Sequence, residues 1–211
     1  MGGLRVVLIG GTSNVGKSTV AHVVAERLRF AYRSTDRLAR HPGRPWRTPE
    51  RGVPPHYAAL PLDELIASVL DHYARLWPRI EDLITAHATG AEAGTGLVLE
   101  GSALWPTRVA GLTVPHTAAV WLTAEEPVVR GRVHGAGHYA EATAGERHLM
   151  DKFLARSGRY QSLMLSEVHR LGLDHLDSGD GRSPEELADA VLSTAAAQHA
   201  VGRSSAEGRP R

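Results

Sequence analysis

The feature that most constrains the fold of this chain is a glycine-rich string close to its N-terminus. Residues Gly11–Ser18, with the sequence GTSNVGKS, match the pattern Gly-x-x-x-x-Gly-Lys-Ser/Thr at every fixed position. The apolar, β-branched run Leu4–Ile9 precedes the string and is typical of a buried parallel strand. Lys17–Phe30 follows, with apolar residues at helical spacing. The sequence therefore predicts a strand–loop–helix unit, and with it an α/β fold.

This string has the chemistry of a phosphate-binding loop. Its glycines allow backbone N–H groups to turn inward around phosphate oxygens, and the following helix directs its positive dipole end at the same anion. We expect Lys17 to reach the β- and γ-phosphates and the Ser18 hydroxyl to ligate Mg²⁺. The pattern thus predicts that the chain binds ATP with Mg²⁺. The expected nucleotide contacts are Gly11, Thr12, Ser13, Asn14, Val15, Gly16, Lys17, Ser18 and Thr19.

Strand and helix patterns alternate along the rest of the 211 residues. Short apolar runs predict strands at Ala31–Ser34, Gly96–Glu100, Ala118–Leu122 and Leu173–Leu176. Helical spacing predicts helices at Leu62–His87, Ala124–Val133, Gly145–Leu171 and from Ser183 to about Ala197. This alternation implies a parallel sheet with helices on both faces. We expect one domain over residues 1–200 and a flexible tail over residues 201–211.

Two connections between these elements have unusual compositions. The segment His41–Pro61 is irregular and rich in proline and arginine. A loop of this length inside a compact domain is usually functional or disordered. The segment His134–Thr143 is rich in glycine, histidine and alanine, and we expect it to be mobile.

Composition excludes several classes of function. The net charge of +1 gives no reason to expect a nucleic-acid partner. Because the chain has no cysteine, a disulfide scaffold and a thiolate metal site are excluded. No apolar run approaches the ~20 residues that span a bilayer, and the N-terminus lacks a signal-peptide layout, so we expect a cytoplasmic protein without a membrane partner. The Asn-Lys-x-Asp and Asp-x-x-Gly strings that a GTPase needs are also missing, and the sequence leaves the oligomeric state open.

Two acids follow predicted strands. Asp36 comes just after the second strand, and Glu100 ends the third. The carboxyl ends of neighbouring parallel strands lie at the same edge of a sheet, where ligands bind. A carboxylate there can accept the proton of an attacking hydroxyl or help to hold Mg²⁺; the alternative for each acid is to cap a helix. The candidate metal ligands are Ser18, Asp36 and Glu100, and the candidate catalytic residues are Asp36 and Lys17.

A basic segment follows the first of these acids. Arginine offers paired donors to planar anions such as carboxylate and phosphate, so the segment favours an anionic acceptor; a solvated basic loop is the alternative. Trp46 within it either stacks on a substrate ring or anchors the loop. The candidate substrate residues are Asp36, Arg37, Arg40, Arg44, Trp46, Glu100, Gly101 and Ser102.

These features together resemble the small P-loop kinases. The string Gly10–Ser18 looks like the Gly-Gly-x-Ser-x-x-Gly-Lys-Ser loops of antibiotic-phosphorylating and 2-phosphoglycerate-kinase-like members. The acid after the second strand, the acid-glycine pair ending the third, and an arginine-containing helix before a lid resemble shikimate kinase, gluconate kinase and chloramphenicol phosphotransferase, within the nucleoside-monophosphate-kinase-like fold. The shikimate kinase signature Asp-x-x-Gly-Gly is missing, and Glu100-Gly101-Ser102 stands in its place, which argues against shikimate as the substrate.

The resemblance implies a three-layer P-loop NTPase fold for this sequence, with a five-stranded parallel sheet of order 2-3-1-4-5. It implies ATP, Mg²⁺ and phosphoryl transfer to a hydroxyl of a small metabolite or antibiotic. It assigns the base to Asp36 and the adenine contact to Arg130 or Arg132, with Ser178–Arg182 against the adenine. It also assigns a mobile lid to about residues 134–145 and a substrate-side cap to about residues 37–90.

Two other functions remain open beside a small-molecule kinase. One is a nucleoside or nucleoside-monophosphate kinase. Such a site stacks aromatic side chains on a base, and the aromatic content of 5% disfavours it. The other is an ATP-binding regulatory protein that transfers no phosphoryl group to a small molecule.

Overall fold

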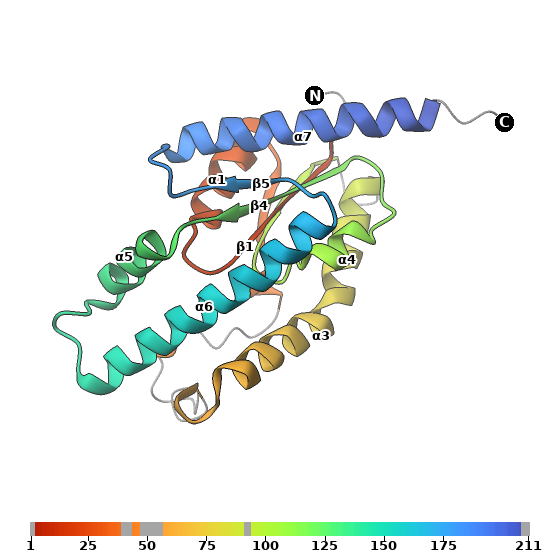
Figure 1. Cartoon of the computed structure of the whole chain (residues 1–211). Coiled ribbons are helices and arrows are strands. Elements are labelled where there is room, and N and C mark those ends of the chain that lie inside the picture. The colour runs from red at the N-terminus through yellow and green to blue at the C-terminus, as the bar shows by residue number, and fades with distance from the viewer. Residues whose placement is uncertain (1–2, 39–43, 47–56, 91–93, 208–211) are drawn as a thin grey trace.

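The centre of the structure is a five-stranded sheet in which every pair of neighbouring strands is parallel. We describe residues 3–38, 44–46, 57–90 and 94–207 of this computed structural model (Figure 1). The sheet has the order β2-β3-β1-β4-β5, which confirms the predicted fold class and strand order. Its strands are β1 (Val6–Gly11), β2 (Ala31–Ser34), β3 (Leu97–Glu100), β4 (Thr117–Thr123) and β5 (His175–Asp177).

Helices cover both faces of the sheet (Figure 1). On one face lie α1 (Lys17–Leu28) and α7 (Pro184–Glu207), which pack against each other. On the other face lie α3 (Leu62–Thr89), α4 (Pro106–Ala110) and α6 (Ala144–Arg170). Helix α5 (Glu126–Gly137) follows β4 and packs on α6.

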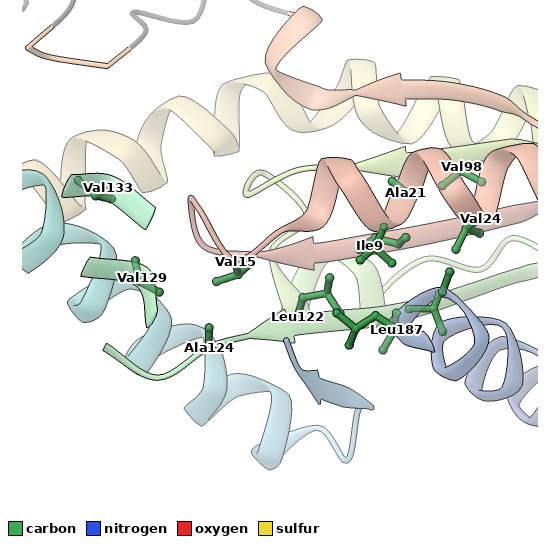
Figure 2. Close-up of a cluster of buried hydrophobic side chains, with 14 of the residues drawn as sticks. Ile9, Val15, Ala21, Val24, Val98, Leu122, Ala124, Val129, Val133 and Leu187 are labelled. Atoms are coloured by element: carbon green, nitrogen blue, oxygen red, sulfur yellow. The ribbon is translucent and has the colours of Figure 1, made fainter. Parts of the chain in front are cut away.

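The two layers enclose two separate cores. Successive side chains of β1 alternate between them, because a strand directs neighbouring residues to opposite faces. Val7 and Ile9 join the cluster beneath α1 and α7, which Figure 2 shows, whereas Val6 and Leu8 join the cluster beneath α3, α4 and α6. All residues of β1 and β3 are buried. This double burial explains why both strands are apolar in the sequence, apart from Glu100 at the end of β3.

Several boundaries differ from the predicted ones. Helix α5 ends at Gly137 rather than near Val133, and His138 closes it in the left-handed conformation with φ 51°. The connection between α5 and α6 is therefore shorter than predicted, and α6 begins after a capping box formed by Thr143 and Glu146.

The other differences lie towards the C-terminus and in the short elements. Helix α7 continues to Glu207 rather than ending near Ala197, so residues 201–207, predicted as part of a tail, are helical. A single glycine costs about 1 kcal/mol relative to alanine, too little to end a helix at Gly202. The short helix α4 was not predicted, and β5 lies at His175–Asp177 instead of Leu173–Leu176.

Helix α3 is one continuous helix with Pro78 inside it, close to the predicted range Leu62–His87. Most of the irregular segment at residues 41–61, together with Arg40, lies outside the described residues. In the part of the chain that the structure describes, no helix is long and apolar enough to cross a membrane.

Candidate functional site

The Gly11–Ser18 loop connects β1 directly to α1, as predicted. Gly11 has φ +137°, and an added Cβ would lie 2.4 Å from the carbonyl oxygen of Leu122, so only glycine fits this close approach of two strands. Val15 is fully buried in the same cluster as Ile9 and Leu122 (Figure 2). The loop is therefore anchored in the core while its backbone faces the carboxyl edge of the sheet.

Lys17 is held inside this loop. Its side chain is 8% exposed, and its ammonium group donates a hydrogen bond to the carbonyl oxygen of Thr12 at 2.6 Å. Burial lowers the pKa of Lys17, and the nearby carboxylates of Glu100 and Asp36 oppose that shift. The buried ammonium thus lies inside the loop that was predicted to surround the phosphates.

Glu100 lies beside the loop, as the strand-end argument predicted. Parallel pairing sets it between Ile9 of β1 and Ser34 of β2. It is 3% exposed, and its Oε1 accepts hydrogen bonds from the Ser18 hydroxyl at 3.1 Å and the Tyr32 hydroxyl at 3.0 Å. Burial, together with the neighbouring Glu100 carboxylate, raises the pKa of Tyr32 to about 12, so this phenol remains a donor at neutral pH.

Asp36 lies in the short 3₁₀ helix η1 (Thr35–Arg37) directly after β2. The cap of this helix is Ser34, whose side chain accepts a hydrogen bond from the backbone N–H of Asp36 at 3.4 Å. Ser34, rather than the Asp36 carboxylate, is therefore the cap of η1. It is exposed and lines the same cavity as Lys17 and Glu100.

This cavity has a volume of about 540 Å³ and runs along the carboxyl edge of the sheet. Residues Ser13–Ser18 of the loop line it. Arg132, Ser178 and Arg182 also line it, as do Asp36, Tyr73 and Ser102. Among the described residues there is no group of three or more His, Asp or Glu side chains arranged to hold a metal ion. A cation at Ser18, Asp36 and Glu100 would therefore complete its coordination with phosphate and water oxygens.

Arg130 and Arg132, which the sequence did not separate, have different surroundings. The guanidinium of Arg132 donates to the carbonyl oxygens of Asn14 at 3.1 Å and Ser178 at 3.0 Å, and thereby links the Gly11–Ser18 loop to the β5–α7 loop. Arg130 pairs with Glu126 one turn earlier on the exposed side of α5 and does not line the cavity. Arg132 is thus the better placed of the two for a nucleotide.

The basic segment after η1 contributes unevenly to the cavity. Arg44 lines it and donates to the side-chain oxygen of Asn14 at 3.1 Å. Trp46 is 7% exposed and packs edge-on against Phe153, with 5.2 Å between the ring centres. This packing favours Trp46 as an anchor of the loop over stacking on a substrate ring. Arg37 is exposed and does not line the cavity, and Arg40 lies outside the described residues.

An aromatic cluster around Arg156 adjoins this part of the cavity. We define the cluster as Tyr57, Tyr73, Phe153 and Tyr160. The Arg156 guanidinium lies 4.9 Å from the Phe153 ring centre and 5.4 Å from that of Tyr57. Burial raises the pKa values of Tyr57 and Tyr73 to about 12, and Tyr160 donates to the Ser102 carbonyl oxygen.

Sequence reasoning missed most of this cluster and also Tyr32. Tyr73 and Tyr160 fit the apolar stripes of α3 and α6, so their spacing indicates core packing and nothing more. Arg156 is one of several basic residues along α6, and its spacing gives no sign of which of them turns inward. One signal in the sequence could have found Tyr32. Its ring carries a hydroxyl, and it belongs to the second strand, which the predicted strand order sets beside the strand of Glu100.

Comparisons with known proteins establish the fold. No protein-family model matches the sequence, and no curated protein matches it. A sugar kinase from Janibacter sp. HTCC2649 gives a TM-score of 0.54 at 23% identity, over 94% of this chain and 98% of its own. An uncharacterized protein from Eubacterium ventriosum ATCC 27560 gives a TM-score of 0.51 at 14% identity, and the match covers 92% of this chain and 98% of that protein.

A gluconokinase from Sinorhizobium meliloti 1021 gives a TM-score of 0.49 at 16% identity, over 98% of this chain and 99% of its own. The two higher-scoring matches span almost the whole of both chains. At the level of the fold, the match to the sugar kinase agrees with the predicted resemblance to small P-loop kinases.

Proposed function

We propose that this protein is an ATP- and Mg²⁺-dependent kinase that transfers the γ-phosphate to a hydroxyl group of a small acceptor. The observation that carries the proposal is the single cavity that joins the complete Gly11–Ser18 loop to Lys17, Glu100 and Asp36. This combination supplies a cation for the phosphates, oxygen ligands for a divalent metal and a carboxylate for the acceptor hydroxyl.

The donor half fits ATP and Mg²⁺. The backbone N–H groups of the loop and the N-terminus of α1 suit the phosphates, and Lys17 already lies buried among them. The oxygens of Ser18, Glu100 and Asp36 suit a hard cation, which when bound neutralises charge on the phosphates. In the same cavity, Arg132 and the Ser178–Arg182 loop are the proposed contacts for the nucleoside.

In the acceptor half, Asp36 has the role of general base. Its exposed carboxylate can receive the proton of the acceptor hydroxyl while it orients that oxygen towards the phosphoryl group. The ammonium of Lys17 would stabilise the charge that develops on the transferred group. The connection between α5 and α6, residues 138–143 within the predicted range 134–145, is the proposed lid, and its closure would exclude water.

The aromatic cluster supports an anionic acceptor. Arg156 is half-buried, and it forms no ion pair with any carboxylate of the described residues. Tyr57 is 7% exposed, and its hydroxyl has no hydrogen-bond partner in the same part of the chain. Burying such groups without partners is costly, so a carboxylate or phosphate on the acceptor that satisfied both would be bound selectively.

The same cluster weakens the compositional argument against a ring-bearing acceptor. Aromatic residues are 5% of the sequence, but Tyr57 and Phe153 enclose Arg156, and Phe153 and Tyr73 line the cavity. Nucleosides therefore belong in an acceptor screen beside sugar acids, glycerate phosphates, shikimate and aminoglycoside-type antibiotics.

An ATP-consumption screen over these acceptors tests the proposal. We expect Asp36→Ala to lower transfer about 10²–10⁴-fold, the usual contribution of a general base, without changing ATP affinity. Asp71→Ala, which removes an exposed acid of α3, is the matched control and should leave transfer intact. Unchanged transfer in Asp36→Ala would show that another group is the base. A wild-type protein that binds ATP but turns over with no acceptor would favour the regulatory alternative.

A further inference from the structure

The phenol of Tyr32 has no part in the proposed function so far, yet it contacts the metal-binding side of the cavity. Tyr32 lies on β2, the edge strand of the sheet. Its ring stacks on His22 of α1, with 3.8 Å between the ring centres and 27° between the planes. Its hydroxyl donates to Glu100 Oε1 at 3.0 Å. The stacking on His22 thus fixes the ring of Tyr32, and the hydrogen bond to Glu100 fixes its hydroxyl.

The same carboxylate oxygen also receives the hydroxyl of Ser18. Glu100 Oε1 accepts from Ser18 at 3.1 Å, so two hydroxyl donors converge on one oxygen of a nearly buried carboxylate. In the described residues, Glu100 Oε2 has no hydrogen bond or ion pair. Because both hydroxyls use their protons on Oε1, the lone pairs of Ser18 and of Glu100 Oε2 remain for another partner.

We propose that Tyr32 is a positioning residue that, through Glu100, orients the oxygens of Ser18 and Glu100 towards a divalent cation bound with the nucleotide. The inference rests on the proposed function. Tyr32 itself does not ligate the cation. By holding Oε1 together with Ser18, it determines which carboxylate oxygen faces the metal and keeps the Ser18 hydroxyl from rotating away. Partners of this second layer commonly change metal affinity 10–100-fold when they are removed.

The test is metal binding by Tyr32→Phe, which keeps the ring and its stacking on His22 but removes the hydroxyl. Mn²⁺ serves as the probe, and its free concentration is followed by electron paramagnetic resonance in the presence of ADP. We expect the Kd for Mn²⁺ to rise about tenfold, whereas the ADP affinity measured in EDTA stays unchanged. Thr107→Val is the matched control, because the Thr107 hydroxyl also donates to a carboxylate, that of Glu167, at 2.7 Å and does not line the cavity. This control should leave both affinities unchanged.

A double-mutant cycle checks that the effect passes through the carboxylate. In a Glu100→Gln background, Tyr32→Phe should have no further effect on Mn²⁺ binding. Mn²⁺ affinity equal to wild type in Tyr32→Phe would overturn the inference. So would a full additional loss in the Glu100→Gln background, or an equal loss of ADP affinity without metal. These results leave the proposed function intact, whereas a wild-type protein that bound neither ADP nor Mn²⁺ with ADP would remove both.

Discussion

Gly101 is the residue whose substitution should most clearly reveal how the two acids are held together. Its backbone N–H donates to the carbonyl oxygen of Ile9 at 3.1 Å, which ties the end of β3 to β1. Its φ is +152°, and an added Cβ would lie 1.8 Å from Thr35 Oγ1. Gly101→Ala therefore combines an unfavourable backbone conformation with a collision against the residue that precedes Asp36.

The expected loss in the free energy of unfolding is the sum of the backbone strain and the collision. A side chain in such a backbone region costs about 1–3 kcal/mol, and forcing an extra methyl into a packed contact costs about 1–3 kcal/mol. Together they predict a loss of roughly 2–6 kcal/mol in the free energy of unfolding. That is a large share of the roughly 5–15 kcal/mol typical of a folded domain.

Urea unfolding of Gly101→Ala and Gly172→Ala separates the two terms. Gly172 also has a positive φ, +63°, but nothing lies within 4 Å of an added Cβ. Its substitution should cost only the left-handed strain of about 1–2 kcal/mol. If Gly101→Ala lost no more stability than Gly172→Ala, the close approach of β3 to η1 would not be what holds Glu100 and Asp36 side by side.

Two further predictions concern the arginines. Arg132→Ala should weaken ATP binding about tenfold, because it removes two hydrogen bonds of a charged group that link the Gly11–Ser18 loop to the β5–α7 loop. Arg130→Ala should leave ATP binding unchanged. Calorimetric titration measures the affinity of both variants, and equal losses would contradict the assignment of Arg132. Arg156→Ala should raise the KM for an anionic acceptor and leave the ATP affinity unchanged. Arg159 is exposed on the same helix, so Arg159→Ala is the control. If steady-state kinetics gave the same KM for both variants, Arg156 would not belong to the acceptor site.

Local patterns predicted the donor half of the site and the order of the elements. The Gly11–Ser18 loop is contiguous in sequence, so its residue types alone indicate its conformation and chemistry. The positions of Glu100 and Asp36 followed from a general rule, since the carboxyl ends of neighbouring parallel strands share one edge. The strand order came from resemblance, and the structure agrees with it.

Helix ends and side-chain directions were less accessible. Arg130 and Arg132 are two residues apart, and about 100° of rotation per residue directs them to nearly opposite sides of α5. Only the packing of α5 against α6 and the loops decides which arginine faces the cavity. The sequence pattern could not choose between them because both fit the same helix equally well.

By itself, then, the sequence determined the phosphate-loop motif, the alternation of strands and helices, and the edge of the sheet at which Asp36 and Glu100 lie. Each depends on neighbouring residues or on a rule that holds for every parallel sheet. Tertiary structure alone decided that Tyr32 contacts Glu100, that Arg132 links the Gly11–Ser18 loop to the β5–α7 loop, and that Tyr57 and Phe153 enclose Arg156. These contacts join segments far apart in the chain, and they arise only when the helices pack onto the two faces of the sheet.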